Sequence, residues 1–579
     1  MNILKKIWRI SSNRIKKFSI LYSFVSVTNS LVEIFALVSL LPFLQFVLGK
    51  NSNEVVFLNY FNFLKNLNLD IKYGTILFLF LIFIFCIKLI FNFLNLYLSQ
   101  KIIFEYSKYL PNMLLNKYLT YHYPFFLRNN SSELLKNITS EIPRVITGCV
   151  AMIIGLISDL TLVFVAVITL LFFDFKSTAL VGILLFFLTF LYIFFSKKMI
   201  FTSGENRRRL DTLNFQTISS TFDNIKLIKI LSRENYFTAF FKNTNNATAK
   251  SHLKFNIISS LPRILLEFIL VIMVILVAII ALTSPNENVI YLLAIYVATA
   301  VRLIPSISKI ISASSNLRFN LPALDILYKE LFDGDANSNN KIIVKNDIVK
   351  LKDKLDFENV TFSHSIKSET ILENISLTIE KNDFIGIIGE TGSGKSTFVD
   401  LLSGLIQPTS GKIIVDNNFV INEENQKVWQ KNIGYLSQNI TVLDGSIREN
   451  IAFGCHESEI DNHKIEKVIE LASLSDFVLK RKGGIFSNIG QGGVLMSGGE
   501  KQRLAIARTL YFDPEFLILD ECTSSLDVHT EFEILNILMK LHSKTIIFIT
   551  HRNHNLKYCN KIYEVKNKRM TLRLINEVF

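Results

Sequence analysis

The chain has few charged residues and few cysteines. Asp, Glu, Lys and Arg make up 19% of its 579 residues, whereas hydrophobic residues make up 50%. This balance argues against a wholly soluble protein. The five cysteines are scattered, without CxxC or metal-ligand spacing, so we expect neither disulfides nor a zinc site. The net charge of +13 is accounted for by positive loops beside a membrane, and no nucleic-acid partner is needed.

Six apolar runs in the first half of the chain are long enough to cross a bilayer as helices. The fourth run is short, and the sixth carries charges. A basic lead-in, MNILKKIWRISSNRIKKF, precedes the first run, which is too long for the apolar core of a signal peptide. The six runs lie at about Phe18–Leu48, Tyr73–Leu98, Val145–Phe173, Thr178–Phe195, Ile258–Thr283 and Val289–Ile311.

The segments between these runs indicate their orientation. Gln100–Arg144 and Ser196–Asn256 are long and rich in Lys and Arg, whereas the segments after the third and fifth runs are only a few residues long. We therefore expect both termini in the cytoplasm. Helical periodicity in the two long segments predicts helices that continue out of the membrane, with tips that could touch a cytoplasmic domain. Asn51–Lys72 fits either a short amphipathic helix at the outer surface or an ordinary loop.

A phosphate-binding loop stands in the second half of the chain. It follows an apolar strand, Phe384–Ile388, and precedes an apolar helix start at Phe398. Backbone N–H groups of such a loop cradle phosphates at the helix N-terminus, Lys395 can reach the β and γ phosphates, and the Ser396 hydroxyl can bind Mg²⁺. A glycine-rich turn without this function is the alternative, and the later motifs disfavour it. The loop reads Gly389-Glu390-Thr391-Gly392-Ser393-Gly394-Lys395-Ser396-Thr397, which fits G-x-x-x-x-G-K-[ST].

Three further motifs carry groups suited to phosphate chemistry. The strand Phe516–Glu521 ends in two acids: Asp520 suits Mg²⁺, and Glu521 suits a general base that polarises water. In isolation, the two acids could instead cap the next helix. Ser497, Gly498 and Gly499 open a helix whose N-terminus offers a second anion site. His551 follows the strand Lys544–Ile549 and can contact a γ-phosphate or serve a structural role.

In this order the motifs resemble those of the ATP-binding cassette transporters, specifically half-transporters of exporter type. The resemblance covers essentially the whole chain: Tyr435–Gln438 matches the Q-loop, Ser524–Asp527 the D-loop and Gly490–Gly493 the exporter-type X-loop. It implies a six-span α-helical transmembrane domain over residues 1–325, a linker over 326–352 and an α/β P-loop ATPase domain over 353–579. It also implies ATP and Mg²⁺ as ligands, and a homodimer in which each ATP lies between the phosphate loop of one chain and Ser497–Gly499 of the other.

The same resemblance assigns site residues. It implies catalytic roles for Glu521, His551, Gln438 and Lys395, and Mg²⁺ contacts from Ser396, Gln438 and Asp520. Four positions depart from the family pattern. Glu500 replaces the usual signature Gln, Met496 the usual Leu and Cys522 the usual Ala, while His364 aligns with the Tyr that stacks on adenine and should stack more weakly.

A charged side chain inside a bilayer is energetically unfavourable, so each ionisable residue within the spans is expected to have a partner or a function. The cations are Lys88, Arg263, Arg302 and Lys309, all in the inner-leaflet half or near the midplane, and the anions are Glu33, Asp159 and Glu267. The cations could line a cavity for an anionic group. Alternatively, Arg263 and Glu267 could neutralise each other on one helix, and Lys309 and Arg263 could snorkel to the interface. Arg302 has no acid on its own helix.

Three segments of the spans resemble the lipid-linked oligosaccharide flippase of bacterial protein N-glycosylation. The resemblance implies an ATPase in the bacterial cytoplasmic membrane that moves a polyprenyl-pyrophosphate-linked glycan from the inner to the outer leaflet. A multidrug, lipid A or peptide exporter is the first alternative; a soluble cassette protein acting on nucleic acid and an ATP-gated channel or sensor are others. The segments are Ser30–Ala36, Leu261–Glu267 and Arg302–Ser306.

Overall fold

The computed structural model divides the chain into two compact units. The first comprises Met1–Tyr121 and Phe126–Ala336, and the second comprises His122–Phe125 and Asn337–Phe579. The structure describes residues 3–40, 73–173, 175–283, 288–333, 349–363, 369–522, 528–539, 541 and 543–573.

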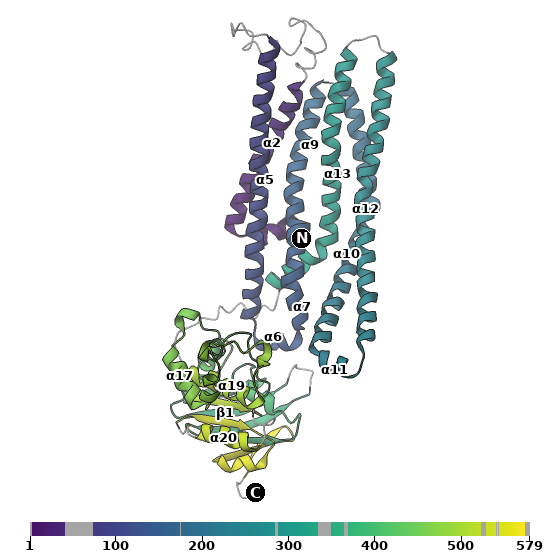
Figure 1. Ribbon diagram of the computed structural model, residues 1–579. Helices are drawn as coiled ribbons and strands as arrows, with labels where there is room; N and C mark the ends of the chain where they lie inside the picture. Colours follow the sequence, from purple (N-terminus) through teal and green to yellow (C-terminus); the bar gives the residue numbers. More distant parts are fainter. Residues whose placement is uncertain are drawn as a thin grey trace. The chain divides into compact units, whose positions relative to one another are not determined.

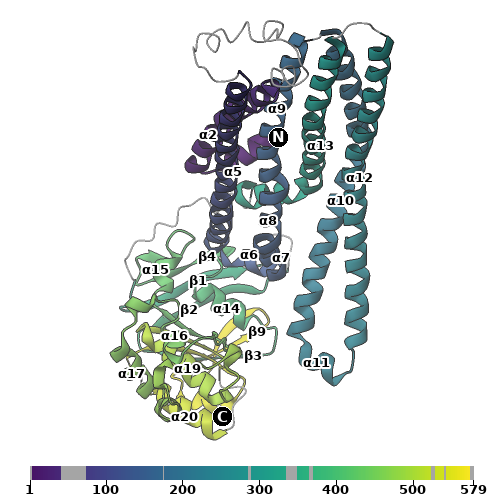
Figure 2. The same cartoon turned by 45° about the horizontal axis from the view of Figure 1, so that its top comes forward.

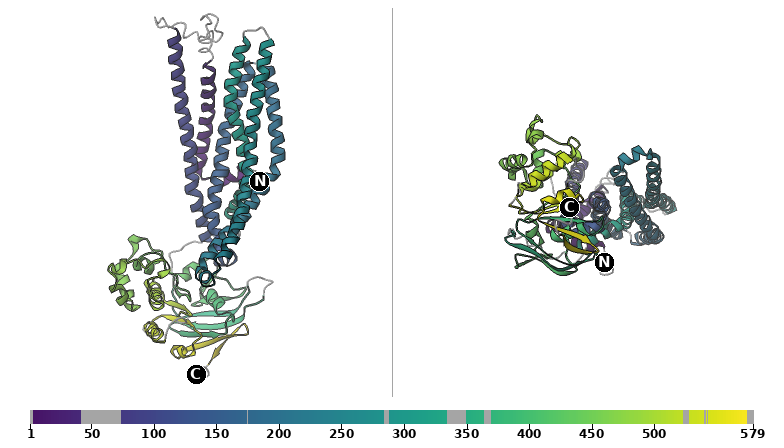
Figure 3. Two further views of the ribbon diagram at one scale, coloured as in Figure 1. Left: turned by 45° about the vertical axis from the view of Figure 1, so that its right-hand side comes forward. Right: turned by 90° about the horizontal axis from the view of Figure 1, so that it is seen from below.

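The first unit is built of long helices that run side by side (Figures 1 and 3). α2 packs against α5 and α9, α10 packs against α12, and α13 packs against α9, α10 and α12. The bounds are α1 Ile3–Ile10, α2 Asn13–Val38, α5 Tyr73–Thr120, α6 Tyr123–Arg128, α7 Ser131–Lys136, η2 Asn137–Glu141, α8 Ile142–Val145, η3 Ile146–Val150, α9 Ala151–Phe173, α10 Phe175–Asp223, α11 Ile225–Ile230, α12 Glu234–Thr283, α13 Asn288–Tyr328 and η4 Lys329–Asp333.

Three stretches of the described chain are long and apolar enough to cross a membrane, namely Asn13–Val38, Phe78–Thr120 and Ser131–Phe172. They correspond to the first three predicted spans, and the other three fall within the single helices α10, α12 and α13. α5, α10 and α12 each extend well beyond the apolar run that they contain. The end of the first predicted span and the segment Asn51–Lys72 lie outside the described residues.

The burial pattern of α2 differs from that of a helix in a soluble protein, because the helix buries several polar residues as well as apolar ones. Ser26, Asn29, Ser30 and Glu33 are buried, whereas apolar side chains of the same helix, such as Phe24, are exposed. Lipid offers no hydrogen-bond partners, so a membrane helix turns its polar side chains toward neighbouring helices and its apolar side chains toward the lipid. The helix begins where Ser12 caps it by accepting a hydrogen bond from the Ile15 N–H.

The second unit holds two sheets with helices around them (Figure 2). One sheet has the strand order β2-β1-β4-β5 and is antiparallel; the other has the order β10-β9-β3-β8-β7-β6, with β9, β3, β8, β7 and β6 parallel. The strands are β1 Lys354–Phe362, β2 Leu372–Glu380, β3 Phe384–Gly389, β4 Ser410–Val415, β5 Phe419–Val420, β6 Ile433–Leu436, β7 Phe516–Asp520, β8 Thr545–Ile549, β9 Lys561–Lys566 and β10 Arg569–Arg573.

An aromatic core fixes the helix that follows the phosphate loop. The Trp429 indole N–H donates to the Leu402 carbonyl at 2.9 Å, and its ring meets Phe516 of β7 edge to face. Phe398 of the same helix stacks on Phe357 of β1. The helices are α14 Lys395–Leu402, α15 Gln426–Gln430, α16 Ile447–Ile451, η6 Glu457–Glu459, α17 Asn462–Leu471, α18 Ser475–Leu479, η7 Gly484–Phe486, η8 Gln491–Gly493, α19 Gly498–Tyr511, α20 Val528–Met539 and η9 Asn553–Tyr558.

The tip of the first predicted cytoplasmic segment belongs to this second unit. His122 lies in it, and its Nδ1 is 2.9 Å from Nε2 of Gln426 at the start of α15. The prediction of a long-helix α-helical unit followed by an α/β unit is confirmed.

Candidate functional site

The phosphate loop joins β3 to α14. β3 ends at Gly389 and α14 begins at Lys395, so the loop lies at the carboxyl end of a parallel strand and at a helix N-terminus. Gly392 and Gly394 have φ angles of 82° and 107°, in the left-handed region that glycine adopts without strain. A Cβ at Gly394 would also come within 2.9 Å of the Leu372 side chain. Both glycines are therefore needed for the path of the loop.

Lys395 lies across this loop. Its ammonium donates hydrogen bonds to the carbonyls of Gly389 and Glu390 at 2.9 and 3.0 Å, and the residue is only 7% exposed. Burial lowers the pKa of Lys395, while the nearby carboxylates of Glu521 and Asp520 act in the opposite direction. The lysine therefore lies near Asp520, the last residue of β7, and near Glu521, which follows it.

Three predicted catalytic residues meet at Glu521. One of its carboxylate oxygens accepts a hydrogen bond from the Gln438 amide at 2.7 Å, and the other lies 2.8 Å from His551 Nε2. The three residues follow β6, β7 and β8, which are neighbours in the parallel sheet, so their carboxyl ends bring them together. Glu521 itself has a φ of 46°, which is unusual for a residue other than glycine and typical of functional positions.

Asp520 has a partner that the sequence reasoning missed. The Tyr435 hydroxyl donates to Oδ2 of Asp520 at 3.0 Å. Burial raises the pKa of Asp520, and this hydrogen bond and Lys395 oppose the rise. The available signal was the position of Tyr435 on the strand that leads into the Q-loop, next to the acidic strand in the sheet.

The signature segment forms a capping box at the start of α19. Ser497 Oγ accepts from the Glu500 N–H, and the Glu500 carboxylate accepts from the Ser497 N–H at 2.7 Å and from its hydroxyl at 2.9 Å. Glu500 therefore holds the N-terminus of the helix. The spacing Ser-x-x-Glu predicts this box from sequence, and the sequence reasoning missed it by comparing Glu500 only with the family's Gln.

The residues of the loop fit a magnesium nucleotide. Ser393 Oγ is buried and has no hydrogen-bond partner among the described residues, so the loop holds an unsatisfied donor where phosphates would bind. Ser396 is the second residue of α14, and Asp520 and Gln438 lie at the ends of strands neighbouring in the sheet. His364 and the predicted D-loop, Ser524–Asp527, lie outside the described residues.

In the membrane unit, Glu33 of α2 lies between two of the four predicted cavity cations. Its Oε1 is 2.6 Å from Arg302 Nη2 of α13 and 3.7 Å from Lys88 Nζ of α5. Glu33 is 3% exposed in its side chain, whereas Arg302 is 41% exposed. Arg302 has no acid on its own helix, and the structure supplies one from a helix far away in the sequence. We name Glu33, Lys88 and Arg302 the counter-ion cluster.

The remaining two cations have different partners. Arg263 Nε lies 2.9 Å from Glu267 Oε1 one turn along α12, so the predicted i,i+4 ion pair is present. Lys309 of α13 attracts the charge of Asp159 of α9, without a close ion pair between them among the described residues. The assignment of all four cations to a substrate cavity stays a prediction.

Polar contacts continue from the counter-ion cluster along the same helices. Asn29 of α2 donates to Asn92 of α5 at 3.1 Å, and Asn95 of α5 donates to Ser158 of α9 at 3.3 Å. Lys88, Asn92 and Asn95 are spaced four and three residues apart, so they share one face of α5. The interior between α2, α5 and α9 is therefore lined with hydrogen-bonding groups.

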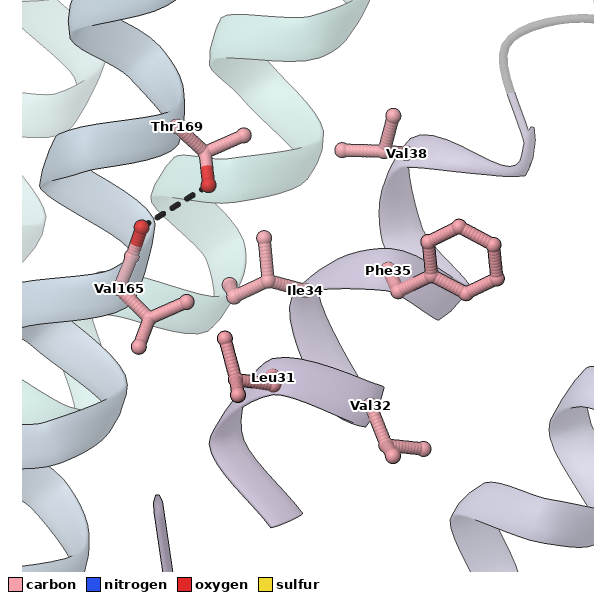
Figure 4. Close-up of a pocket in the computed structure, with 7 residues that line it drawn as sticks. All are labelled: Leu31, Val32, Ile34, Phe35, Val38, Val165 and Thr169. Atoms are coloured by element: carbon pink, nitrogen blue, oxygen red, sulfur yellow. Dashed lines mark hydrogen bonds between the residues drawn. The ribbon is translucent and has the colours of Figure 1, made fainter. Parts of the chain in front are cut away.

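An open apolar groove lies on α2 beside α9 (Figure 4). Its volume is about 480 Å³. Leu31 and Ile34 face Val165 and Thr169, and the Thr169 hydroxyl bonds the Val165 carbonyl at 2.9 Å, which satisfies the one polar side chain of the lining. The groove is thus suited to apolar groups. Its lining is Leu31, Val32, Ile34, Phe35, Val38, Val165 and Thr169.

Together these features define a membrane transporter driven by a P-loop ATPase. Residues 372–524 match the family described as ABC transporter, and residues 19–298 match the ABC transporter transmembrane region. The two matches together cover most of the chain, which belongs to the ABC transporters and has the organisation of an exporter half-transporter, with one membrane domain and one ATPase domain. It is a multi-pass membrane protein, and its ATPase domain hydrolyses ATP to drive transport.

Three similar proteins illustrate the relationship. The chain is 26% identical over 448 residues to an ATP-dependent lipid A-core flippase of Ralstonia nicotianae, covering 76% of this chain and 74% of that protein. It is 30% identical over 384 residues to a multidrug resistance ABC transporter ATP-binding and permease protein of Lactococcus lactis, covering 64% and 63%. A solved structure of a bacterial Atm1-family ABC exporter with ATP bound has a TM-score of 0.80 at 19% identity, covering 98% of this chain and 96% of that one, and so shares its fold.

Proposed function

We propose that the chain acts as a homodimer in the bacterial cytoplasmic membrane and flips a polyprenyl-pyrophosphate-linked oligosaccharide from the inner to the outer leaflet. The observation that carries this proposal is the presence of Arg302 and Lys88 inside the membrane unit, partly exposed and joined by a single acid. Cations in such positions are costly and are kept for a function. An anionic group that travels through the membrane supplies that function.

The depth and chemistry of the cations suit a pyrophosphate. Lys88 is ten residues before the inner end of the second predicted span and Arg302 is nine before that of the sixth, which places both about 15 Å from the inner surface. The planar guanidinium of Arg302 can bind two phosphate oxygens at once. The apolar groove on α2 supports a substrate that also carries an apolar chain. Both termini lie in the cytoplasm in this arrangement.

ATP hydrolysis in this proposal uses the residues gathered at the end of the parallel sheet. Glu521, held by Gln438 and His551, takes the role of the base that polarises the attacking water. Lys395 would contact the β and γ phosphates, and Ser396, Asp520 and Gln438 would hold the metal. Mg²⁺, when bound with ATP, neutralises charge on those phosphates. Ser497–Gly499 of the partner chain complete the site, and the long helices carry the closure to the membrane.

The names of the relatives provide the competing substrates. Lipid A-core is the cargo named for the Ralstonia relative, and it is the second candidate because it is also a lipid-linked glycan. A drug is the third, from the Lactococcus relative. The counter-ion cluster disfavours an apolar cationic drug, because such a molecule would be repelled by Arg302 and Lys88.

The test is ATP-driven flipping in proteoliposomes. The full-length protein is supplied with a polyprenyl-pyrophosphate glycan, with lipid A-core and with a cationic drug in separate experiments. We expect ATP-dependent movement of the pyrophosphate glycan and faster ATP hydrolysis in its presence. Flipping of lipid A-core or the drug alone would contradict the proposed substrate.

A double variant tests the cavity assignment. Arg302→Ala together with Arg263→Ala should impair flipping at least tenfold, because phosphate contacts to Arg are charge-assisted. Of the single variants, Arg302→Ala should carry most of the loss, because Arg263 is already paired with Glu267. Unchanged flipping in the double variant would remove the cationic cavity from the proposal.

A further inference from the structure

The counter-ion cluster contains an acid where the proposed function requires a binding site for an anion. Glu33 is nearly fully buried, and its carboxylate forms an ion pair with Arg302 at 2.6 Å. The same oxygen also lies 3.7 Å from Lys88, so one carboxylate serves two cations from two other helices. Any phosphate group that binds both cations must therefore compete with Glu33.

The cluster is incompletely satisfied. Nε of Arg302 is buried and has no hydrogen-bond partner among the described residues. An unsatisfied buried donor is unfavourable, and an oxygen-rich anion would supply the missing hydrogen-bond acceptor. With one carboxylate for two cations, the cluster also carries one positive charge in excess. Both features favour binding of an anion with more oxygens and more charge than a carboxylate.

The neighbouring ionic groups leave this imbalance in place. The charge of Asp159 on α9 is attracted mainly by Lys309 and less by Arg302. Asp159 and Lys309 offset each other in charge. The excess positive charge therefore stays with Arg302 and Lys88, the two residues that Glu33 joins.

We propose that Glu33 is a specificity-determining residue that acts as an internal competitor for the substrate's anionic group. Its carboxylate occupies the cations in the substrate-free transporter and yields only to a multiply charged headgroup, such as a pyrophosphate. Ordinary phospholipids with one negative charge, such as phosphatidylglycerol, are thereby kept out of the cavity. This inference rests on the proposed function, because it assumes that an anionic lipid enters the site.

Charge removal at constant shape tests this role. Glu33→Gln keeps the size and a hydrogen-bonding oxygen but removes the competing charge. In phosphatidylcholine proteoliposomes, we expect the half-saturating concentration of a polyprenyl-pyrophosphate glycan for ATPase stimulation to fall about tenfold, the scale of one ion-pair contact. When phosphatidylglycerol is added, the half-saturating concentration for Glu33→Gln should rise again, because that lipid now competes with the glycan for the two cations. The unsubstituted protein should respond little to phosphatidylglycerol.

Matched variants separate charge from structure. Glu33→Asp keeps the charge and should behave as the unsubstituted protein. Glu105→Gln removes another acid that joins α2 and α5, through Arg14 at 3.1 Å, and should leave both readouts unchanged. If Glu33→Gln does not assemble, the comparison is made in a Lys88→Met background. The double variant Glu33→Gln/Lys88→Met should then have a lower half-saturating concentration than the single variant Lys88→Met.

Each outcome decides the proposal. A half-saturating concentration that is unchanged or higher in the assembled Glu33→Gln variant, or the same phosphatidylglycerol response in both proteins, would overturn it. If the unsubstituted protein shows no response to the pyrophosphate glycan, the proposed function is wrong, and the phosphatidylglycerol arm alone decides the role of Glu33. In that case, if phosphatidylglycerol changes the ATPase rate of Glu33→Gln but not that of the unsubstituted protein, the role of Glu33 as a competitor is supported. If phosphatidylglycerol changes neither rate, that role is overturned.

Discussion

At the residue scale, the proposed mechanism depends on how the Glu521 carboxylate is held. Gln438 and His551 each bind one of its oxygens, and its own N–H donates to the Ile549 carbonyl at 3.1 Å. Together these contacts hold Glu521 in a backbone conformation with positive φ, which is unfavourable for a residue other than glycine. The side chain is thus positioned before any substrate arrives, as a general base requires.

Glu521→Gln should lower the ATPase rate constant by at least about 100-fold, because an amide cannot accept the proton of the attacking water. ATP binding should persist, because the phosphate loop is untouched. The measurements are ATPase turnover and equilibrium ATP binding. Glu515→Gln, at an acid that pairs with Lys350 at the other end of β7, is the control and should leave turnover unchanged. Substantial hydrolysis by Glu521→Gln would show that another group is the base.

A second residue-scale prediction concerns Glu500. Its carboxylate sits on Ser497, at the helix N-terminus that would meet the γ-phosphate bound to a partner chain. Glu500→Gln keeps an oxygen that can accept the Ser497 N–H and removes the negative charge. We expect the KM for ATP to fall about threefold, because the negative charge of Glu500 repels the negatively charged γ-phosphate. Steady-state ATPase kinetics measure this change.

A second capping box provides the matched control for Glu500. Ser446 and Glu449 form the same reciprocal hydrogen bonds at the start of α16, outside the signature. Glu449→Gln should therefore leave the KM for ATP unchanged. Equal shifts of KM in the two variants would show that the effect comes from helix capping and not from charge beside the nucleotide.

At the element scale, a buried ionic cluster joins several helices of the first unit. Glu141 of η2 lies 2.9 Å from Lys136 of α7, and both side chains are 1% exposed. Arg144 of α8 reaches Asp211 of α10 at 2.8 Å and also lies 3.5 Å from Glu141. The cluster thus ties the segment leading into α9 to the long helix α10.

Glu141→Gln should destabilise the protein by about 3–5 kcal/mol, because it leaves the charge of Lys136 buried with its acid removed. Thermal unfolding in detergent should show a clear fall of the midpoint. The exposed ion pair of Lys229 and Glu234, 3.0 Å apart beside α11, is the comparison. Glu234→Gln should produce no measurable change, since exposed pairs contribute little. Similar shifts in both variants would contradict a stabilising role for the buried cluster.

The same elements show what the sequence can predict. Local patterns were sufficient for the strand at Phe384, the phosphate loop, the long apolar helices and the pair Arg263–Glu267, because each depends on residues close together in the chain. The contact of Glu33 with Arg302 was not predictable, since it depends on the register of helices 269 residues apart. The Tyr435 contact with Asp520 likewise depends on β6 lying beside β7.

At the scale of the whole molecule, the signature segment points to a second chain. Ser497 uses its hydrogen bonds on Glu500, and the neighbouring Val494 and Leu495 are 81% and 59% exposed. Large apolar side chains exposed beside a polar helix N-terminus are typical of an interaction surface. This supports the prediction that each ATP lies between the phosphate loop of one chain and the signature of another.

Complementation between two inactive chains tests this arrangement. Lys395→Ala removes the phosphate-contacting lysine of the loop, and Ser497→Arg places a bulky side chain in the signature. Each variant alone should therefore lack ATPase activity. In a mixed dimer, the intact loop of one chain meets the intact signature of the other, and one of two sites is restored. With random pairing, half of the dimers are mixed, so ATPase activity should recover to about a quarter of that of the unsubstituted protein.

The control replaces the Lys395→Ala chain by one that carries both substitutions. No pairing of that chain with Ser497→Arg contains an intact loop facing an intact signature, so no activity should return. If each site were instead complete within one chain, Lys395→Ala and Ser497→Arg would damage separate complete sites, and mixing them would restore nothing. Recovery in the first mixture and not in the second therefore requires that a site takes its phosphate loop and its signature from different chains.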